Sequence, residues 1–118
     1  RQYRKPLECE MLEIVAGGLE KGELPEACAV RETREETGYE TAAVVKLGVM
    51  ALAPGYSSEL LHVFHARLAK AGKSCPDRDE HLQQVRLTEA EIDGMIERNE
   101  IMDAKTIATW HLWKARRK

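Results

Sequence analysis

The chain has 118 residues, 43% hydrophobic and 32% charged, which is the size and balance of one ordinary globular domain. Twenty acidic against eighteen basic residues give a formal net charge of −2, which argues against a nucleic-acid-binding protein or one drawn to anionic membranes. The chain lacks both a long apolar span and a signal peptide, and its three cysteines are widely separated, so we expect a cytoplasmic protein with reduced thiols.

The first part of the chain predicts a strand, a glycine turn and a helix. Residues 11–16 are apolar apart from Glu13 and stop at a Gly-Gly pair, which indicates a strand running into a tight turn. Pro25 suits a first helical turn, and Gly38 suits the position just past a helix end. We therefore expect a helix over residues 25–37.

The middle of the chain predicts two strands joined by a turn. Residues 41–52 are rich in Ala and Val, and residues 59–68 resume an apolar pattern. Between them, residues 53–58 have the Pro-Gly and Ser-Ser composition of a turn. Residues 69–80 are polar and predict a loop.

The last part of the chain predicts one short strand and two helices. Residues 82–87 indicate the strand, and Thr88 followed by Glu91 is the capping-box arrangement that begins a helix. A final helix over about residues 103–116 places apolar side chains at helical spacing.

The helix predicted over residues 25–37 carries its carboxylates in unfavourable positions. Glu32, Glu35 and Glu36 project from one face, where like charges repel, and the last two lie in the final turn, where the helix dipole disfavours anions. A solvated face, with Arg31 reaching Glu35, is the ordinary explanation. Carboxylates on one face beside a glycine turn also suit Mg²⁺ or Mn²⁺, and function often overrides local preference in this way.

This stretch resembles the Nudix box, written G-x5-E-x7-R-E-U-x-E-E-x-G-U, where U is a bulky apolar residue. Every fixed letter matches, and the departures at U positions, Thr33 and Tyr39, concern packing beneath the loop. The matching residues are Gly17, Glu23 after five residues and, after seven more, Arg31-Glu32-Thr33-Arg34-Glu35-Glu36-Thr37-Gly38-Tyr39.

The resemblance implies a role for each matching position. It implies a divalent cation, Mg²⁺ or Mn²⁺, held by side chains of the helix and by one backbone carbonyl. It also implies an ion pair that holds the loop onto the helix, and glycines that let the backbone approach a diphosphate. The metal ligands would be Glu32, Glu35, Glu36 and the carbonyl of Ala16; the ion pair Glu23 and Arg31; and the glycines Gly17 and Gly18.

A second match points to one group of Nudix enzymes. Pro54 lies 16 positions beyond Gly38 and begins Pro-Gly-Tyr-Ser-Ser-Glu, which is similar to the ADP-ribose pyrophosphatases. The opening Gln-Tyr-Arg segment looks like the same group. The likeness implies that Arg4 and Glu59 contact substrate, Arg4 as a cation reaching phosphate.

The resemblance also implies a base outside the ligand set. In the related enzymes a glutamate in the loop before a late strand serves near this point, and Glu80 lies where it should. Glu80 could act as base, as an extra metal ligand or as neither. Glu35 and Glu80 are the candidate catalytic residues.

The implied fold is α+β, an α/β/α sandwich with a mixed sheet between helices. Residues 1–118 would form one Nudix domain without its N-terminal strands, working as a homodimer on a small-molecule nucleotide. The implied reaction is hydrolysis of a nucleoside diphosphate derivative, ADP-ribose giving AMP and ribose 5-phosphate. The alternatives are a nucleotide sugar such as GDP-mannose as substrate, or a non-catalytic module that binds a nucleotide.

Overall fold

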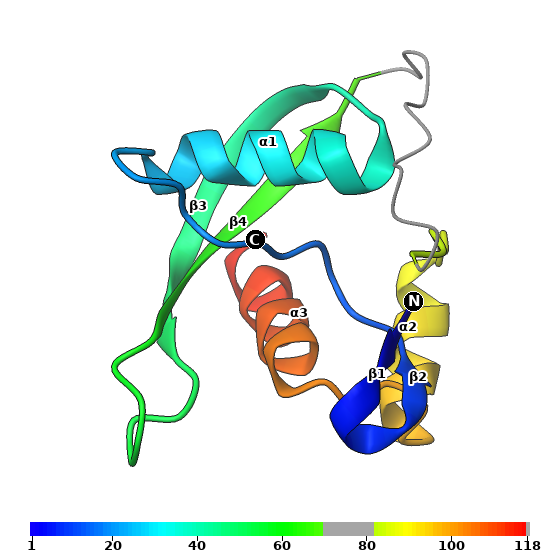
Figure 1. Cartoon of the computed structure of the whole chain (residues 1–118). Helices are drawn as coiled ribbons and strands as arrows, with labels where there is room; N and C mark the ends of the chain where they lie inside the picture. The colour runs from blue at the N-terminus through cyan, green and yellow to red at the C-terminus, as the bar shows by residue number, and fades with distance from the viewer. Residues whose placement is uncertain (70–81, 118) are drawn as a thin grey trace. The chain divides into compact units, whose positions relative to one another are not determined.

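The computed structural model describes residues 1–69 and 82–117 of the chain (Figure 1). These residues fall into two compact units, one formed by residues 1–14 and 82–111 and the other by residues 15–69 and 112–117. In chain order the elements are β1 (Gln2–Arg4), the 3-10 helix η1 (Lys5–Leu7), β2 (Cys9–Met11), α1 (Pro25–Thr37), β3 (Thr41–Ala51), β4 (Leu60–Leu68), α2 (Glu89–Glu97) and α3 (Ala104–Arg116).

The first unit contains the short antiparallel pair β1 and β2, joined through η1. Glu8 turns the chain between them with a left-handed φ of 50°. The buried apolar residues of this unit are Met11 and Ile101, and the polar residues Thr106 and Thr109 on α3 are buried as well. The unit is therefore small, with α2 and α3 supplying most of its regular structure.

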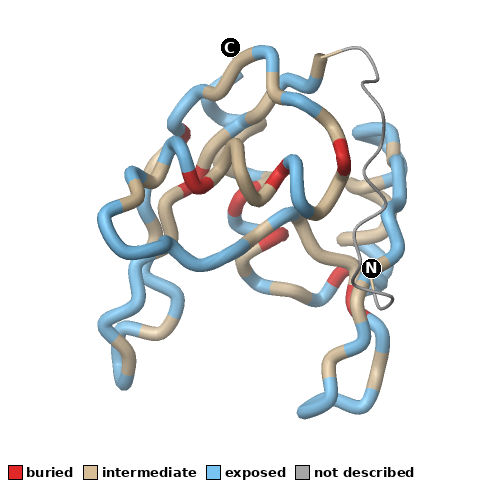
Figure 2. Tube along the Cα trace, turned by 45° about the horizontal axis from the view of Figure 1, so that its top comes forward, coloured by how far each residue is buried: buried red, intermediate tan, exposed pale blue. Residues whose placement is uncertain are grey.

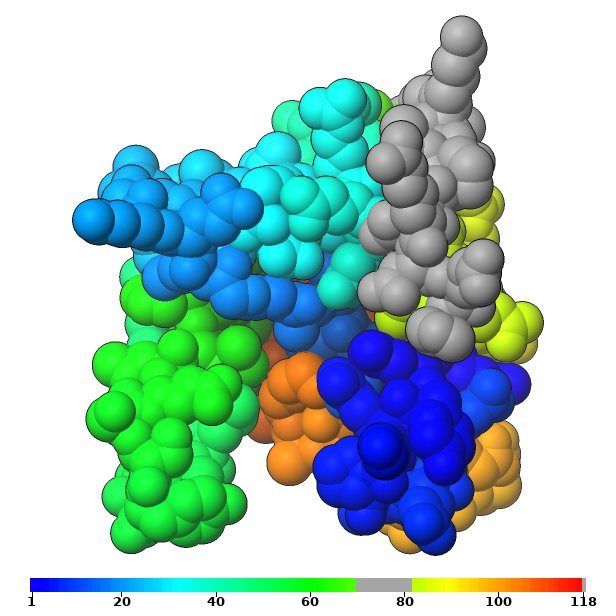
Figure 3. All heavy atoms as spheres, in the orientation of Figure 1, coloured from blue at the N-terminus to red at the C-terminus, as the bar shows by residue number. Residues whose placement is uncertain are grey.

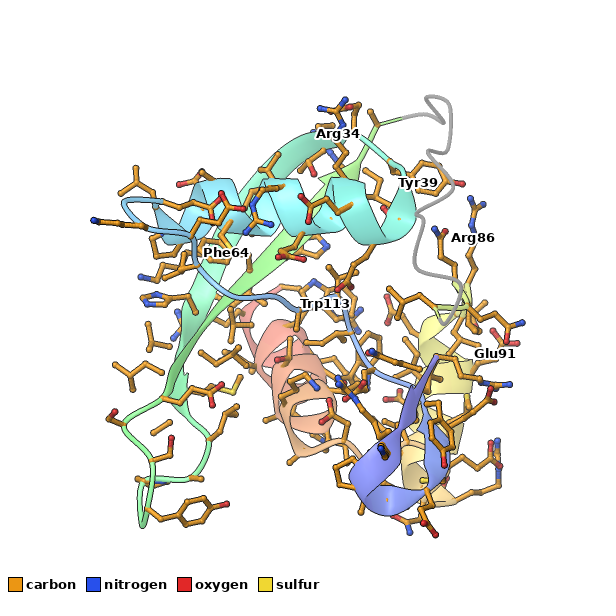
Figure 4. All side chains as sticks on the ribbon, in the orientation of Figure 1. Arg34, Tyr39, Phe64, Arg86, Glu91 and Trp113 are labelled. Carbon is orange, nitrogen blue, oxygen red and sulfur yellow. The ribbon has the colours of Figure 1, made fainter. Side chains whose placement is uncertain are left out.

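Helix α2 begins at the capping box that the sequence predicted. The Thr88 hydroxyl accepts a hydrogen bond from the Glu91 backbone at 3.2 Å, and the Glu91 carboxylate accepts one from the Thr88 backbone at 2.7 Å. Figure 4 shows Glu91 at the start of the helix. These bonds satisfy two N–H groups that a helix start otherwise leaves without partners, which confirms the predicted cap.

The second unit is built on a hairpin of β3 and β4, with α1 packed against both strands (Figure 1). The register passes from Lys46 opposite Phe64 to Gly48 opposite Val63, so Leu47 is an extra residue in a bulge. Leu47 and Val63 are buried, as is Cys28 on α1. Figure 2 marks the buried positions of the chain in red. This core fixes the helix on the hairpin and so positions the candidate site.

Most of the elements predicted from the sequence are present. The predicted helix over residues 25–37 has the observed bounds of α1, and both hairpin strands and the last helix begin and end within one residue of expectation. Helix α2 begins directly after Thr88, as predicted. At the hairpin turn, the backbone N–H groups of Tyr56 and Ser57 both donate to the carbonyl of Ala53. Of the loop predicted over residues 69–80, only Ala69 lies among the described residues.

The strand predicted over residues 11–16 is wrong beyond its first residue. β2 ends at Met11, and the following segment is irregular up to the glycine pair. Its backbone is bound by a side chain instead of a neighbouring strand, because the Ile14 N–H donates to the Thr106 hydroxyl at 3.0 Å. The apolar residues of this segment predicted a strand. The segment is irregular because its backbone is hydrogen-bonded to a threonine side chain and not to a second strand.

The strand predicted over residues 82–87 is also wrong. Leu82 forms an isolated antiparallel bridge with Gln2, and the Gln83 N–H donates to the carbonyl of Arg1 at 3.0 Å. The pairing does not extend into a strand, because residues 83–87 belong to no strand of the described part of the chain.

The α+β class is confirmed, but the sheet differs from the implied one. Within the described residues each unit has one antiparallel pair, β1 with β2 and β3 with β4, in place of a continuous mixed sheet. β1 and β2 were not predicted, because three-residue strands are too short to show an alternating pattern. None of the helices in residues 1–69 and 82–117 has the length and apolarity needed to cross a lipid bilayer.

Candidate functional site

The candidate site lies where an irregular loop meets helix α1 in the second unit. Leu24 is extended and Pro25 begins the helix, while Gly38 ends it with a left-handed φ of 76° and donates its N–H to the Arg34 carbonyl at 2.8 Å. Figure 3 shows the loop, in the lighter blue, lying against α1, in cyan. The proline and the glycine therefore set the length of the helix that carries the carboxylates.

Glu32 is held against the backbone of the glycine turn. A β-carbon on Gly17 would overlap the carboxylate of Glu32, so no larger residue fits there without a shift. The Glu32 side chain is only 16% exposed. By contrast, a β-carbon on Gly18 would meet nothing within 4 Å. The two adjacent glycines thus differ: Gly17 admits a carboxylate, and Gly18 faces open space.

One edge of the Arg31 guanidinium holds the loop. Its Nε and Nη2 donate to the two carboxylate oxygens of Glu23 at 2.8 and 2.9 Å, and Nη2 also donates to the carbonyl of Gly18 at 3.0 Å. The hydrogen bonds from Arg31 are the main reason that the pKa of Glu23 falls from its ordinary value of 4.5 to about 2. The same bonds raise the pKa of Arg31 above its ordinary value. This bidentate ion pair is the one that the resemblance implied.

The other edge of Arg31 reaches the carboxylates of α1. Nη1 donates to Glu32 Oε1 at 2.8 Å and to Glu35 Oε2 at 3.1 Å. The bond to Glu32 joins sequence neighbours, which ordinarily do not face each other on a helix. Spacing alone therefore predicts the Glu35 contact but misses the Glu32 contact.

Known proteins identify the family. A sequence profile of the NUDIX domain matches residues 1–110. The chain belongs to the Nudix family. It is 41% identical over 108 residues to an ADP-ribose pyrophosphatase of Bacillus subtilis and 43% identical over 108 residues to a methanol dehydrogenase activator of Bacillus methanolicus. Each match covers 90% of this chain and 58% of the relative, so the chain spans little more than half the length of these proteins.

A third relative carries a different substrate in its name. A GDP-mannose pyrophosphatase of Citrobacter koseri is 40% identical over 103 residues, which cover 83% of this chain and 52% of the relative. The relatives therefore place the chain in the Nudix family but do not agree on one substrate.

The donor atoms at this Nudix site suit a hard divalent cation. Within residues 1–69 and 82–117 no three His, Cys, Asp or Glu side chains are gathered so as to hold a metal as they stand. Glu32 and Glu35 nevertheless contact one nitrogen of Arg31, so oxygens from both side chains can converge on a single positive charge. Glu36 is half-buried one turn beyond Glu32. Carboxylate oxygens are the ligands that Mg²⁺ and Mn²⁺ prefer, so these residues fit such an ion.

Two residues beneath the site explain how α1 packs. Cys28 is buried below the loop, and burial is the main reason that the pKa of its thiol is raised. Thr33, the polar residue at an apolar position of the motif, is 8% exposed and donates its hydroxyl to the Ala29 carbonyl at 2.7 Å. Because that hydroxyl is hydrogen-bonded within the helix, the departure from the motif costs little.

The remaining expected residues are not all gathered with α1. Ala16 belongs to the irregular segment that leads into Gly17, and Glu59 is exposed in the loop before β4. Arg4 belongs to the first unit, where it pairs with Glu13. Glu80 lies outside the described residues.

Glu13 is a buried, paired carboxylate that the sequence motifs do not single out. Its side chain is 9% exposed and accepts hydrogen bonds from Arg4 at 2.9 and 3.1 Å and from Lys105 at 2.8 Å. Lys105 also donates to Asp103 at 2.8 Å. The sequence does carry a signal for it, because Glu13 is the single acid in the apolar stretch of residues 11–16. A carboxylate in such a stretch is expected to be buried and therefore to need cationic partners.

Proposed function

We propose that this protein hydrolyses a nucleoside diphosphate linked to another group, in a reaction that requires Mg²⁺ or Mn²⁺. The observation that carries the proposal is the convergence of the Glu32 and Glu35 carboxylates beside the Gly17 turn. Glu32, Glu35 and Glu36 would hold the cation together with the carbonyl of Ala16. When bound, such a cation neutralises diphosphate charge and lowers the pKa of a coordinated water.

The protein's own residues would position the diphosphate beside these carboxylates. The Glu23–Arg31 ion pair holds the loop on α1 through the Gly18 carbonyl. Because Gly18 has no side chain and open space beside it, a phosphate oxygen can approach the backbone there. Alignment of this kind supplies most of what hydrolysis of a phosphoric anhydride needs.

We assign three further residues to the reaction on the strength of the family resemblance. Arg4 would contact phosphate, and Glu59 would contact the substrate from the hairpin loop. Glu80 would act as general base or as an additional ligand, with Glu35 as the other catalytic candidate. We also propose that the working protein is a homodimer, which light scattering of the purified protein tests directly.

ADP-ribose is the substrate that we propose, with AMP and ribose 5-phosphate as products. The support is the relative named ADP-ribose pyrophosphatase and the segment from Pro54 to Glu59, which is similar to that group. GDP-mannose is the second candidate, because several relatives at 37–40% identity are named GDP-mannose pyrophosphatases.

A product assay separates these candidates. Purified protein in Mg²⁺ is incubated with ADP-ribose or with GDP-mannose, and the release of AMP or GMP is measured by chromatography. We expect faster AMP release, and loss of both activities in Glu36→Gln. Faster GMP release would support the second candidate. Nucleotide binding without turnover in wild-type protein would favour a non-catalytic binding module.

A further inference from the structure

We propose that Arg31 acts as an internal counter-cation that competes with a divalent ion for the carboxylates of Glu32 and Glu35 and so lowers the affinity for that ion. The inference rests on the proposed function, because it takes Glu32 and Glu35 to be metal ligands. It goes beyond that function by giving Arg31 a role in setting metal affinity, in addition to its role in the loop.

The geometry points to this role because the two edges of the guanidinium have separate partners. Nε and Nη2 bind Glu23 and the Gly18 carbonyl, whereas Nη1 alone binds Glu32 and Glu35. Rotation of the two glutamates away from Nη1 breaks no bond to the loop. Nε and Nη2 can therefore keep their bonds to the loop while Nη1 loses its bonds to the two glutamates.

Burial makes Arg31 an effective competitor for the carboxylates. The side chains of Arg31 and Glu32 are 24% and 16% exposed, so water screens this pair less than an ordinary surface ion pair. Glu35 is 52% exposed and is held more weakly. A cation that takes both carboxylates must overcome mainly the bond between Arg31 and Glu32.

Glu32 would leave Nη1 by rotating away from the Gly17 backbone, while the guanidinium stays in place. The Glu32 carboxylate already lies against Gly17, which leaves no room for it to retreat toward the turn. Arg31 stays anchored by Glu23 after Nη1 is freed, so its positive charge remains near the site. Arg31 should thus limit metal affinity in two ways, by occupying the ligands and by repelling the ion.

Metal-binding calorimetry tests this inference without an activity assay. Mn²⁺ is titrated into the purified chain and into Arg31→Gln, Glu23→Gln and Arg34→Gln. We expect Arg31→Gln to bind Mn²⁺ roughly tenfold more tightly, the factor that corresponds to loss of one charge-assisted hydrogen bond. Glu23→Gln should bind no more tightly than wild type, because the Nη1 contacts remain.

Arg34→Gln is the matched control for charge alone. Arg34 lies on the same helix, projects from its upper side in Figure 4 and pairs with Glu40 at 3.2 Å, with a side chain that is 63% exposed. An equal gain in affinity in Arg34→Gln and Arg31→Gln would overturn the displacement model. Weaker binding in both Arg31→Gln and Glu23→Gln would overturn it too, since Arg31 would then act only through the loop.

Thermal unfolding in EDTA shows whether each variant is folded. If Arg31→Gln does not fold, Arg31→Lys is used in its place. A single ammonium group cannot hold the loop and both carboxylates at once, so this variant also frees the glutamates. Folded Arg31→Lys should bind Mn²⁺ more tightly than wild type, and unchanged or weaker binding would overturn the inference. Wild-type protein that binds no Mn²⁺ overturns the proposed function as well, whereas wild-type binding and hydrolysis without the Arg31 effect overturn only this inference.

Discussion

The carboxylate of Glu32 lies so close to the backbone of Gly17 that a β-carbon on the glycine would overlap it. Gly17 does not need glycine for its backbone conformation, because its φ lies outside the left-handed region that disfavours other residues. A side chain at this position would instead require the Glu32 carboxylate to move. The glycine at the start of the motif therefore leaves room for the first candidate metal ligand.

Gly17→Ala should weaken Mn²⁺ binding by about tenfold or more while leaving the chain folded, because the new methyl group displaces the Glu32 carboxylate. Calorimetry measures the affinity, and circular dichroism checks the fold. Gly18→Ala is the matched control for the metal measurement alone, since a β-carbon there meets nothing within 4 Å. Equal Mn²⁺ affinity in Gly17→Ala and wild type would contradict the assignment of Glu32 as a ligand.

Glu32→Gln and Glu36→Gln should each lower turnover by several orders of magnitude. Each variant should stay folded, because Arg31 keeps its bonds to Glu23 and to the Gly18 carbonyl. Relief of like-charge repulsion should add little in Glu32→Gln, since Arg31 already lies between Glu32 and Glu35. Steady-state kinetics and urea unfolding measure the two effects.

Glu26→Gln is the control for those variants, because Glu26 is exposed in the first turn of the same helix. It should retain wild-type turnover. Wild-type rates in either Glu32→Gln or Glu36→Gln would refute the site.

The Glu23–Arg31 ion pair should make stability depend on pH in the acid range. The pKa of Glu23 is lowered by folding from 4.5 to about 2, so its carboxylate stabilises the folded state fully above pH 4.5. The contribution is lost as the pH falls from about 4.5 toward 2. The difference in unfolding free energy between wild type and Glu23→Gln should therefore be constant from pH 5 to 7 and shrink below that range. A constant difference at every pH down to 3 would show that Glu23 is not held by Arg31.

Glu13→Gln should destabilise the first unit by about 2–3 kcal/mol, because it leaves the charges of Arg4 and Lys105 with less compensation. The cost is moderated because Lys105 keeps Asp103 and because the Arg4 side chain is 41% exposed. Urea unfolding measures the change. Glu10→Gln, on the exposed side of β2, should be close to neutral. Equal free energies of unfolding in the two variants would show that the Glu13 ion pairs contribute no measurable stability.

Local signals predicted the parts of the fold that local chemistry controls. Helix α1 has its expected bounds because Pro25 and Gly38 act on their own backbone, and α2 begins at Thr88 because the capping box closes within four residues. The strands predicted over residues 11–16 and 82–87 failed for the opposite reason. A strand needs a partner, and the pattern of one segment does not report what lies beside it.

The sequence by itself determined that the chain resembles the Nudix family, that its carboxylates share one helix face, and where that helix begins and ends, because the motif and the helix signals lie within one segment. Only the tertiary structure decided that Glu32 rests on Gly17, that Arg31 divides its two edges between Glu23 and the ligand carboxylates, and that Glu13 is buried between Arg4 and Lys105. These contacts depend on the direction of side chains and on the approach of segments distant in the chain. Neither is encoded in the spacing of residue types, because each depends on how the whole unit packs.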